Sequence, residues 1–188
     1  MLDWLIIGGG VHGTYLSHLL VNQLGVSRDN VRVLDPHDQP LAAWMRFTAN
    51  CGMTYLRSPA THKNDLPILS LYRFAKPLID EAAGVFIPPY NRPSLTLFNE
   101  HCQYVIRENR LEDLRITGRA ISLEKNGRSI TAKTSAGRLK TRNIILAIGL
   151  SEQPYWPAWA RSIQKAGAKI NHLFDIDFRP AGLSDSTM

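Results

Sequence analysis

The sequence lacks the apolar runs and the cysteine content of membrane-spanning and disulfide-stabilised proteins. None of its apolar runs approaches the about 20 residues that cross a bilayer. The run before the first glycines, Trp4–Ile7, is too short for a signal peptide. Its two cysteines, Cys51 and Cys102, lie far apart and lack metal-ligand spacing, so we expect buried free thiols, with a disulfide as the alternative. We therefore expect a soluble, cytoplasmic protein with no membrane partner.

Histidines at metal-ligand spacing are also lacking. His62, His101 and His172 stand alone in the sequence, and we assign no metal site. Residues 101–150 hold ten Lys or Arg and four Asp or Glu, which accounts for the whole net charge of +6.

The basic residues of this segment lack the interleaved aromatic residues of many nucleic-acid-binding surfaces. We expect a solvated sheet face and no nucleic-acid partner. The residues concerned are Arg115, Arg119, Lys125, Arg128, Lys133, Arg138, Lys140 and Arg142.

What the sequence does contain is a glycine-rich turn directly after a short apolar strand. Trp4–Ile7 is followed by Gly8-Gly9-Gly10-Val11-His12-Gly13, which has the GxGxxG spacing. Gly8 permits a tight turn, Gly10 lets the backbone approach a pyrophosphate, and Gly13 lets a helix pack closely. The whole loop, Gly9 and His12 included, is a candidate cofactor-binding segment. We expect the His12 side chain to face solvent or pack on the next helix, with a catalytic role as the alternative.

The segment after the glycines has the pattern of a helix followed by a second strand. Val11, Tyr15, Leu19 and Leu20 recur at helical spacing, and the amide end of such a helix suits a diphosphate. The predicted strand Val31–Leu34 ends at Asp35, where a ribose hydroxyl would need an acceptor. The alternative is that Asp35 only caps the strand and the glycines form an ordinary turn.

The rest of the chain predicts an irregular insert followed by a β-meander. We expect residues 36–93 to be proline-rich and irregular, with short helices near Pro40–Phe47 and Ile68–Phe74, and to line a ligand. Pro93 fits the first turn of a helix that ends near Asn109. A meander is predicted over residues 114–142. Its parts are strands Leu114–Leu123 and Ser129–Thr134, turns Lys125–Arg128 and Ser135–Gly137, and a short edge Leu139–Thr141.

A final strand, Ile144–Ile148, is apolar enough to be buried on both faces and ends at Gly149. At the carboxyl end of a central strand, a side chain at Gly149 would hinder a nucleotide. The alternative is a glycine that merely ends the strand. Residues 1–150 thus form one α/β domain, with a Rossmann-like parallel sheet that contains the βαβ unit.

This order of elements resembles the FAD-binding half of glutathione-reductase-like flavoproteins, which have two dinucleotide-binding domains. Ala147-Ile148-Gly149 matches their Ala-Thr-Gly-like motif, with Ile148 in place of the usual Thr. Trp44, Asn50–Pro59, Ser70-Leu71 and Phe74 are similar to single-component flavin monooxygenases, especially lysine and ornithine N-hydroxylases and related FAD/NAD(P)-binding proteins.

The resemblance implies FAD as the cofactor. The diphosphate would lie on Gly8–Gly13, the adenosine ribose on Asp35, and the flavin ring near Trp44 and Met53 to Arg57. NADPH would reduce the flavin, and one oxygen atom would pass to an amine or another soft nucleophile, so no catalytic side chain is assigned. Arg57 would stabilise the reduced flavin, or alternatively form a surface salt bridge.

A second GxGxxG, which binds the nicotinamide nucleotide in such flavoproteins, is missing. Residues 151–188 read as a connector toward an NAD(P)-binding domain, and Gly182–Met188 resemble the approach to a strand. We expect an incomplete enzyme that would use NADPH only with a second domain. Trp156, Trp159 and Leu173 would then expose an apolar face for that domain or for self-association. The alternatives are a non-catalytic module for FAD or an adenine nucleotide, and an NAD-dependent dehydrogenase.

Overall fold

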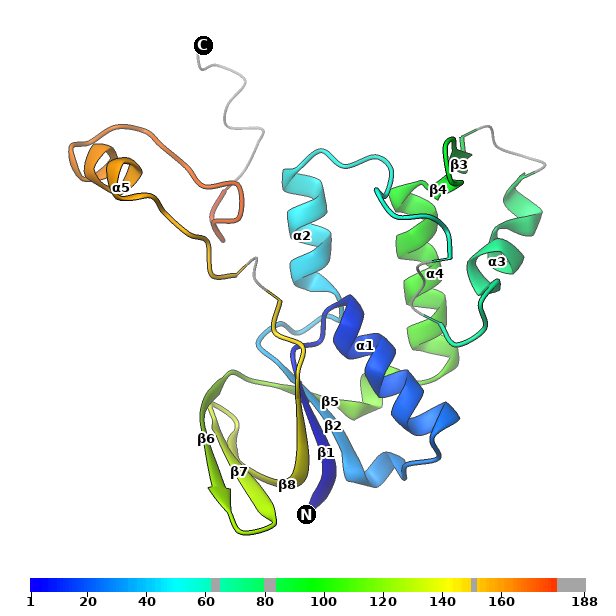
Figure 1. Ribbon diagram of the computed structural model, residues 1–188, viewed down its shortest axis with the longest axis vertical. Coiled ribbons are helices and arrows are strands. Elements are labelled where there is room, and N and C mark those ends of the chain that lie inside the picture. The colour runs from blue at the N-terminus through cyan, green and yellow to red at the C-terminus, as the bar shows by residue number, and fades with distance from the viewer. Residues whose placement is uncertain (62–64, 80–83, 150–151, 179–188) are drawn as a thin grey trace.

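A six-stranded mixed sheet forms the centre of the computed structural model, which describes residues 1–61, 65–79, 84–149 and 152–178 (Figure 1). The strand order is β5-β2-β1-β8-β7-β6. The strands are β1 (Leu2–Ile7), β2 (Val31–Asp35), β5 (Arg115–Thr117), β6 (Ala120–Asn126), β7 (Ser129–Thr134) and β8 (Gly137–Leu146). A separate antiparallel ribbon pairs β3 (Phe86–Ile87) with β4 (Arg92–Pro93).

Five α-helices are described, α1 to α4 beside the sheet and α5 apart from it. They are α1 (Val11–His18), α2 (Ala42–Asn50), α3 (Ser70–Ile79), α4 (Leu95–Glu108) and α5 (Ala158–Lys165). Shorter helical turns are π-helical η1 (Leu19–Gln23) and the 3₁₀ turns η2 (Arg28–Asn30) and η3 (Leu111–Leu114).

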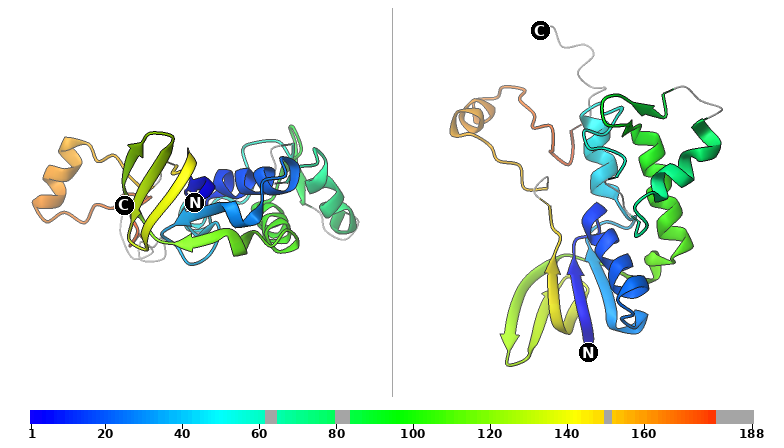
Figure 2. Two further views of the ribbon diagram at one scale, coloured as in Figure 1. Left: turned by 90° about the horizontal axis from the view of Figure 1, so that it is seen from below. Right: turned by 45° about the vertical axis from the view of Figure 1, so that its right-hand side comes forward.

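Strand β1 lies between β2 and β8 and runs parallel to both. Because side chains alternate along a strand, Ile6 enters the core under the helices. Leu5 and Ile7 pack on the opposite face against Ala132 of β7. The meander lies on the side of the sheet away from α3 and α4 (Figure 2). The predicted α/β fold with its βαβ unit is confirmed.

The meander differs from the prediction in two places. The predicted strand Leu114–Leu123 is two strands, because the chain turns at Gly118: β5 pairs with β2, and β6 pairs with β7. A β-carbon at Gly118 would lie 3.1 Å from the β-carbon of Ala136, so the turn packs closely. The predicted edge Leu139–Thr141 is part of the continuous strand β8, which pairs first with β7 and then with β1.

The prediction that Ile144–Ile148 is buried on both faces is wrong. Leu146 is 61% exposed and Ile148 is 54% exposed. The meander packs on the sheet around Ala132 but does not cover the carboxyl ends of the strands. This uncovered end is where the candidate site lies.

The helices follow the predicted positions, with differences at their ends and faces. Short helices α2 and α3 occur where the insert predicted them. Pro93 lies in β4, so the expectation that it occupies the first helical turn is wrong. Helix α4 begins at Leu95, after Ser94, whose hydroxyl accepts a hydrogen bond from the Leu97 amide at 3.2 Å. Of the predicted apolar stripe, Leu20 is buried in η1 and Val11 packs on the core, while Tyr15 and Leu19 are only partly buried. Within α1 itself the buried residues are Gly13, Thr14, Ser17 and His18. Gly13, which has no side chain, permits the close approach of α1 to the turn after β1.

The segment after residue 151 carries apolar side chains on its surface. Trp159 of α5 is 63% exposed and Leu173 is 39% exposed. Trp156 is partly covered, because its ring lies 5.5 Å from that of His172. Gly182–Met188 lie outside the described residues. Within the described part of the chain, no helix has the length and apolarity needed to cross a membrane.

Candidate functional site

The glycine turn at the end of β1 is held by close backbone packing. Gly8 has φ of +108°, and a β-carbon there would collide with the carbonyl oxygen of Ala147. A β-carbon at Gly13 would collide with the carbonyl oxygen of Gly8. Both positions therefore require glycine, as their places in the GxGxxG spacing predict.

Gly10 differs from these two glycines because it borders open space. No described atom lies within 4 Å of a β-carbon built on Gly10. Gly10 is the N-cap of α1, no side chain caps the helix, and its first turn contains no acidic residue. The N–H groups of its first turn therefore donate to no acceptor within the helix, and no acidic side chain of that turn neutralises the positive end of the helix dipole. A bound anion would accept hydrogen bonds from these N–H groups and supply the negative charge. The His12 side chain is exposed, as predicted.

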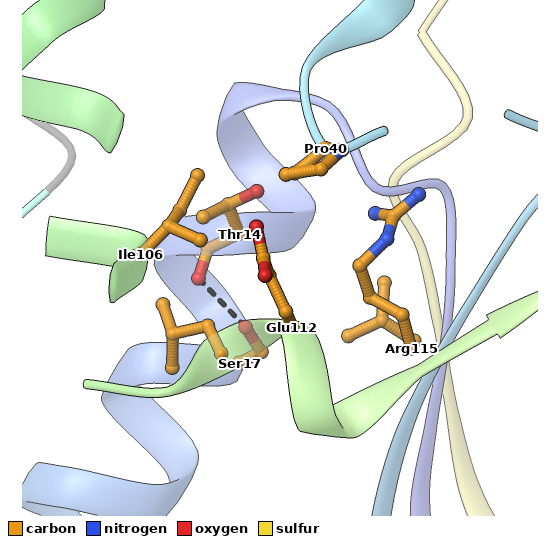
Figure 3. Close-up of a pocket in the computed structure, with 8 residues that line it drawn as sticks. Thr14, Ser17, Pro40, Ile106, Glu112 and Arg115 are labelled. Carbon is orange, nitrogen blue, oxygen red and sulfur yellow. Dashed lines mark hydrogen bonds between the residues drawn. The ribbon is translucent and has the colours of Figure 1, made fainter. Parts of the chain in front are cut away.

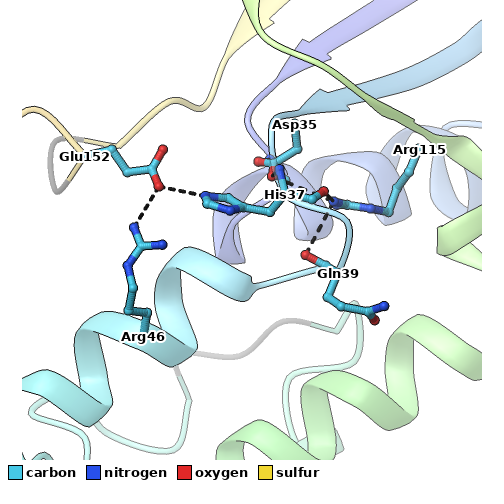
Figure 4. Close-up of polar contacts among 7 residues, drawn as sticks. Asp35, His37, Gln39, Arg46, Arg115 and Glu152 are labelled. Carbon is cyan, nitrogen blue, oxygen red and sulfur yellow. Dashed lines mark hydrogen bonds and ion pairs between the residues drawn. The ribbon is translucent and has the colours of Figure 1, made fainter. Parts of the chain in front are cut away.

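Asp35 lies at the end of β2 beside this turn and is 9% exposed (Figure 4). One carboxylate oxygen, Oδ2, accepts a hydrogen bond from the Gly9 amide, and the other, Oδ1, accepts one from the His37 amide at 3.0 Å. Arg115 Nη2 lies 3.7 Å from Oδ1 and donates to the His37 carbonyl oxygen at 2.9 Å. The Gly9 amide, the His37 amide and Arg115 therefore together hold this carboxylate beside the glycine turn.

The prediction that Arg115 belongs to a solvated sheet face is wrong. Its side chain is 11% exposed, because Arg115 pairs with Val33 in the sheet and its guanidinium extends to Asp35 and the His37 carbonyl oxygen. The Lys133, Arg138 and Lys140 side chains agree better with that prediction, since they belong to the meander and are partly or fully exposed.

A cleft of about 280 Å³ opens at the carboxyl ends of β1, β2 and β8. It brings together three predicted positions, Gly8, Asp35 and Gly149. Gly149 has φ of +61° and borders open space. The apolar part of the lining comes mainly from the meander and β8. It includes Ile121, Leu123, Leu146 and Ile148.

Two further polar residues contact the cleft through Glu152. Glu152, which lines the cleft, accepts hydrogen bonds from His37 Nε2 at 2.6 Å and Arg46 Nη2 at 2.9 Å (Figure 4). Burial raises the pKa of Glu152, but the hydrogen bonds from Arg46 and His37 outweigh it, so the pKa lies below its ordinary value. These contacts are not predictable from the sequence, because Glu152 is more than a hundred residues from both partners.

The residues predicted to surround a flavin ring are not among those lining this cleft. Trp44 Nε1 donates to Asn99 Oδ1 at 2.9 Å, and its ring lies 5.6 Å from that of Phe98, so Trp44 joins α2 to α4. Met53 is half-buried and Arg57 is exposed. Their part in cofactor binding stays a prediction.

A much smaller void lies behind Arg115, between α1, α4 and the start of β5 (Figure 3). Its volume is about 10 Å³, and its lining includes Thr14, Ser17, Ile106 and Arg115. This volume is comparable to a single water molecule, so the void cannot hold a cofactor.

Two buried histidines flank Asp65 away from the cleft. His18 Nε2 lies 3.0 Å from Asp65 Oδ1, and His101 Nε2 lies 4.0 Å from Asp65 Oδ2. The prediction that His101 is isolated is therefore wrong. Neither ring nitrogen of His101 has a hydrogen-bond partner among the described residues. Burial lowers the pKa of His101, and the Asp65 carboxylate partly offsets this.

His62 lies outside the described residues. Within the residues that are described, no three His, Cys, Asp or Glu side chains form a group suited to a metal ion. Neither cysteine forms a disulfide; Cys102 is buried as predicted, but Cys51 is exposed, contrary to prediction.

The sequence matches no protein-family profile and no curated protein. Its fold is similar to those of solved oxidoreductases. A structure of OTEMO with FAD and NADP aligns with 84% of this chain at 18% identity, with a TM-score of 0.56. NADP⁺-bound cyclohexanone monooxygenase from Rhodococcus sp. Phi1 aligns with 83% of this chain at 20% identity, with a TM-score of 0.53. Bacillithiol disulfide reductase from Bacillus cereus aligns with 79% of this chain at 17% identity, with a TM-score of 0.51.

The chain spans 27% of each of the first two proteins and 40% of the third. At these identities the likeness concerns the fold alone, and the predicted Rossmann-like α/β fold is confirmed. The likeness therefore does not show what the chain binds, which has to be inferred from the geometry of its own residues.

Proposed function

We propose that this chain is the FAD-binding part of an NAD(P)H-dependent flavin oxidoreductase. The observation that carries the proposal is the uncapped amide end of α1, which borders open space beside the Asp35 carboxylate. A dinucleotide presents a diphosphate next to a ribose, and this arrangement offers amide donors next to a carboxylate acceptor. The Gly8–Gly13 turn holds the diphosphate, and Asp35 accepts from the ribose.

The apolar wall of the cleft supports FAD binding further. Ile121, Leu123 and Leu146 give an adenine ring a surface on which to bury its faces. Gly149 leaves the carboxyl end of β8 unobstructed. FAD supplies the redox chemistry when bound, and this chain contributes binding, orientation and exclusion of water.

A finer proposal is a monooxygenase of the N-hydroxylase type. Two of the similar structures are of OTEMO with FAD and NADP and of a cyclohexanone monooxygenase with NADP⁺. In this proposal the flavin ring extends toward Trp44, Met53 and Arg57. The NADPH that reduces it binds to a second domain, which packs on the exposed side chains near Trp159.

The test is a titration of the purified chain with FAD, FMN and ADP. We expect FAD to bind with a change in flavin absorbance and fluorescence, ADP to compete with it, and FMN, which lacks the adenylate half, to bind far more weakly. Absence of flavin binding, or FMN binding as tight as FAD, would contradict the proposal.

A non-catalytic module for FAD or another adenine nucleotide is the second candidate, favoured because the amide end of α1 and the Asp35 carboxylate fit the phosphate and ribose that these ligands share. Such a module binds FAD in the same titration. It is distinguished by the absence of NADPH oxidation when a nicotinamide-nucleotide-binding domain is supplied.

A further inference from the structure

The Glu152 carboxylate, which lines the cleft, joins the loop after β2 to helix α2. His37 lies in the loop after β2, Arg46 lies on α2, and both donate to the same oxygen, Oε1 of Glu152 (Figure 4). The His37 and Arg46 side chains are each 20% exposed, and that of Glu152 is 26% exposed. Water therefore screens these charges only partly.

His37 also connects this cluster to the proposed ribose acceptor. Its backbone amide donates to Asp35 Oδ1 at 3.0 Å, while its ring donates to Glu152 at 2.6 Å. Asp35 and Glu152 line the same cleft as Gly8. The donors of His37 and Arg46 therefore hold a carboxylate that lines the cleft proposed to bind the dinucleotide.

The donors of Arg46 are not all used by Glu152. Its Nε atom is buried and has no hydrogen-bond partner among the described residues. A guanidinium binds carboxylate and phosphate oxygens with the same forked geometry, so a phosphate that carries more oxygens than Glu152 could use this remaining donor.

We propose that His37 and Arg46 are a second anion-binding pair of the dinucleotide site, in which the Glu152 carboxylate takes the place of a dinucleotide phosphate. The inference rests on the proposed function. A phosphate that binds to this pair must displace Glu152, so Glu152 is a competitor of the dinucleotide. Removing the Glu152 charge then strengthens FAD binding, and removing the Arg46 charge weakens it.

The test compares FAD affinity of the wild-type chain with that of Glu152→Gln and Arg46→Gln, measured by flavin fluorescence at low and high salt. We expect a dissociation constant for FAD that is several-fold lower for Glu152→Gln than for the wild type. For Arg46→Gln we expect a dissociation constant about tenfold higher, because the phosphate loses a hydrogen bond to a charged group. Both differences should shrink at high salt. Glu124→Gln is the matched control, because Glu124 pairs with Lys133 on the meander, and its affinity should equal that of the wild type.

The sign of the two changes decides the outcome. If Glu152→Gln and Arg46→Gln both weaken FAD binding, Glu152 is a structural clamp and the inference is wrong, while the proposed function stands. If neither the wild type nor Glu152→Gln binds FAD, both fail. Thermal unfolding checks that each variant folds, and His37→Asn replaces Arg46→Gln if the latter does not, with the same expected weakening.

Discussion

The two faces of the central sheet are closed to different extents. On one face, Ile6, Val31 and Val33 are fully buried under the helices. On the other, Leu5 is buried by the meander, but Leu146, which pairs with Ile7, is 61% exposed. The same strands thus have a face that is packed along its length and a face that opens into a cleft at its carboxyl end. Stability comes mainly from the first face, and we propose that binding occurs on the second.

The position of the cleft follows from the strand directions. Parallel strands β1, β2 and β8 end at one edge of the sheet, where their following turns diverge. The glycine turn, Asp35 and Gly149 are those three ends. The meander leaves this edge uncovered, which gives a ligand access to backbone amides and to apolar side chains together.

The largest expected difference between the faces is in stability. Ile106 on α4 is 1% exposed in the helical core, so Ile106→Ala should lower the free energy of unfolding by about 2–5 kcal/mol. Leu146→Ala on the open face should lower it by less than about 0.5 kcal/mol. Urea unfolding measures both, and equal losses would contradict the division between the faces.

The next effect separates packing from binding within the glycine turn. Gly13→Ala places a methyl group against the Gly8 carbonyl oxygen and should cost about 1–3 kcal/mol of stability. Gly10→Ala meets open space, so it should leave thermal unfolding unchanged while weakening FAD binding. Gly10→Ala binding FAD as tightly as wild type would show that the diphosphate does not approach this position.

Asp35→Asn tests the ribose acceptor. The Asn amide keeps one oxygen acceptor, so it can no longer accept from both the Gly9 and His37 amides, and the ribose loses a charged acceptor. We therefore expect FAD affinity to fall about tenfold. Isothermal titration measures the change. Asp3→Asn is the control, because Asp3 pairs with Arg142 at the other end of β1, and its FAD affinity should not change.

The smallest expected effect is the pH dependence from His101 in the helical core. Burial lowers its folded pKa below the ordinary 6.5, so the unfolded chain takes up a proton first as the pH falls. The contribution of neutral His101 to stability is present above pH 6.5 and is lost as the pH falls toward the folded pKa.

His101→Leu should therefore flatten the acid side of the stability curve, measured by urea unfolding between about pH 7.5 and 5, the range in which a histidine titrates. His12→Gln, at an exposed position, is the control and should keep the slope of the wild type. If the free energy of unfolding of His101→Leu falls with pH as steeply as that of the wild type, another group causes the pH dependence.

Part of the candidate site could be predicted because it depends on local sequence. Gly8 and Gly13 lie within one turn, and Asp35 ends the strand that follows the next helix, so spacing alone placed them together. Arg115 was misassigned, because charge pattern does not show that β5 lies next to β2. Glu152 was missed because its partners belong to the loop after β2 and to α2, and the sequence carries no signal for that contact.

By itself the sequence determined the βαβ unit, the glycines that its turn requires, and the hairpin between β6 and β7, since each depends on backbone sterics and side-chain periodicity over short distances. Only the tertiary structure decided that the chain turns at Gly118, that β8 joins the meander to the parallel sheet, and that its carboxyl end is exposed. These features depend on which distant strands pair and on how far the meander covers the sheet. Local propensity contains no information about either.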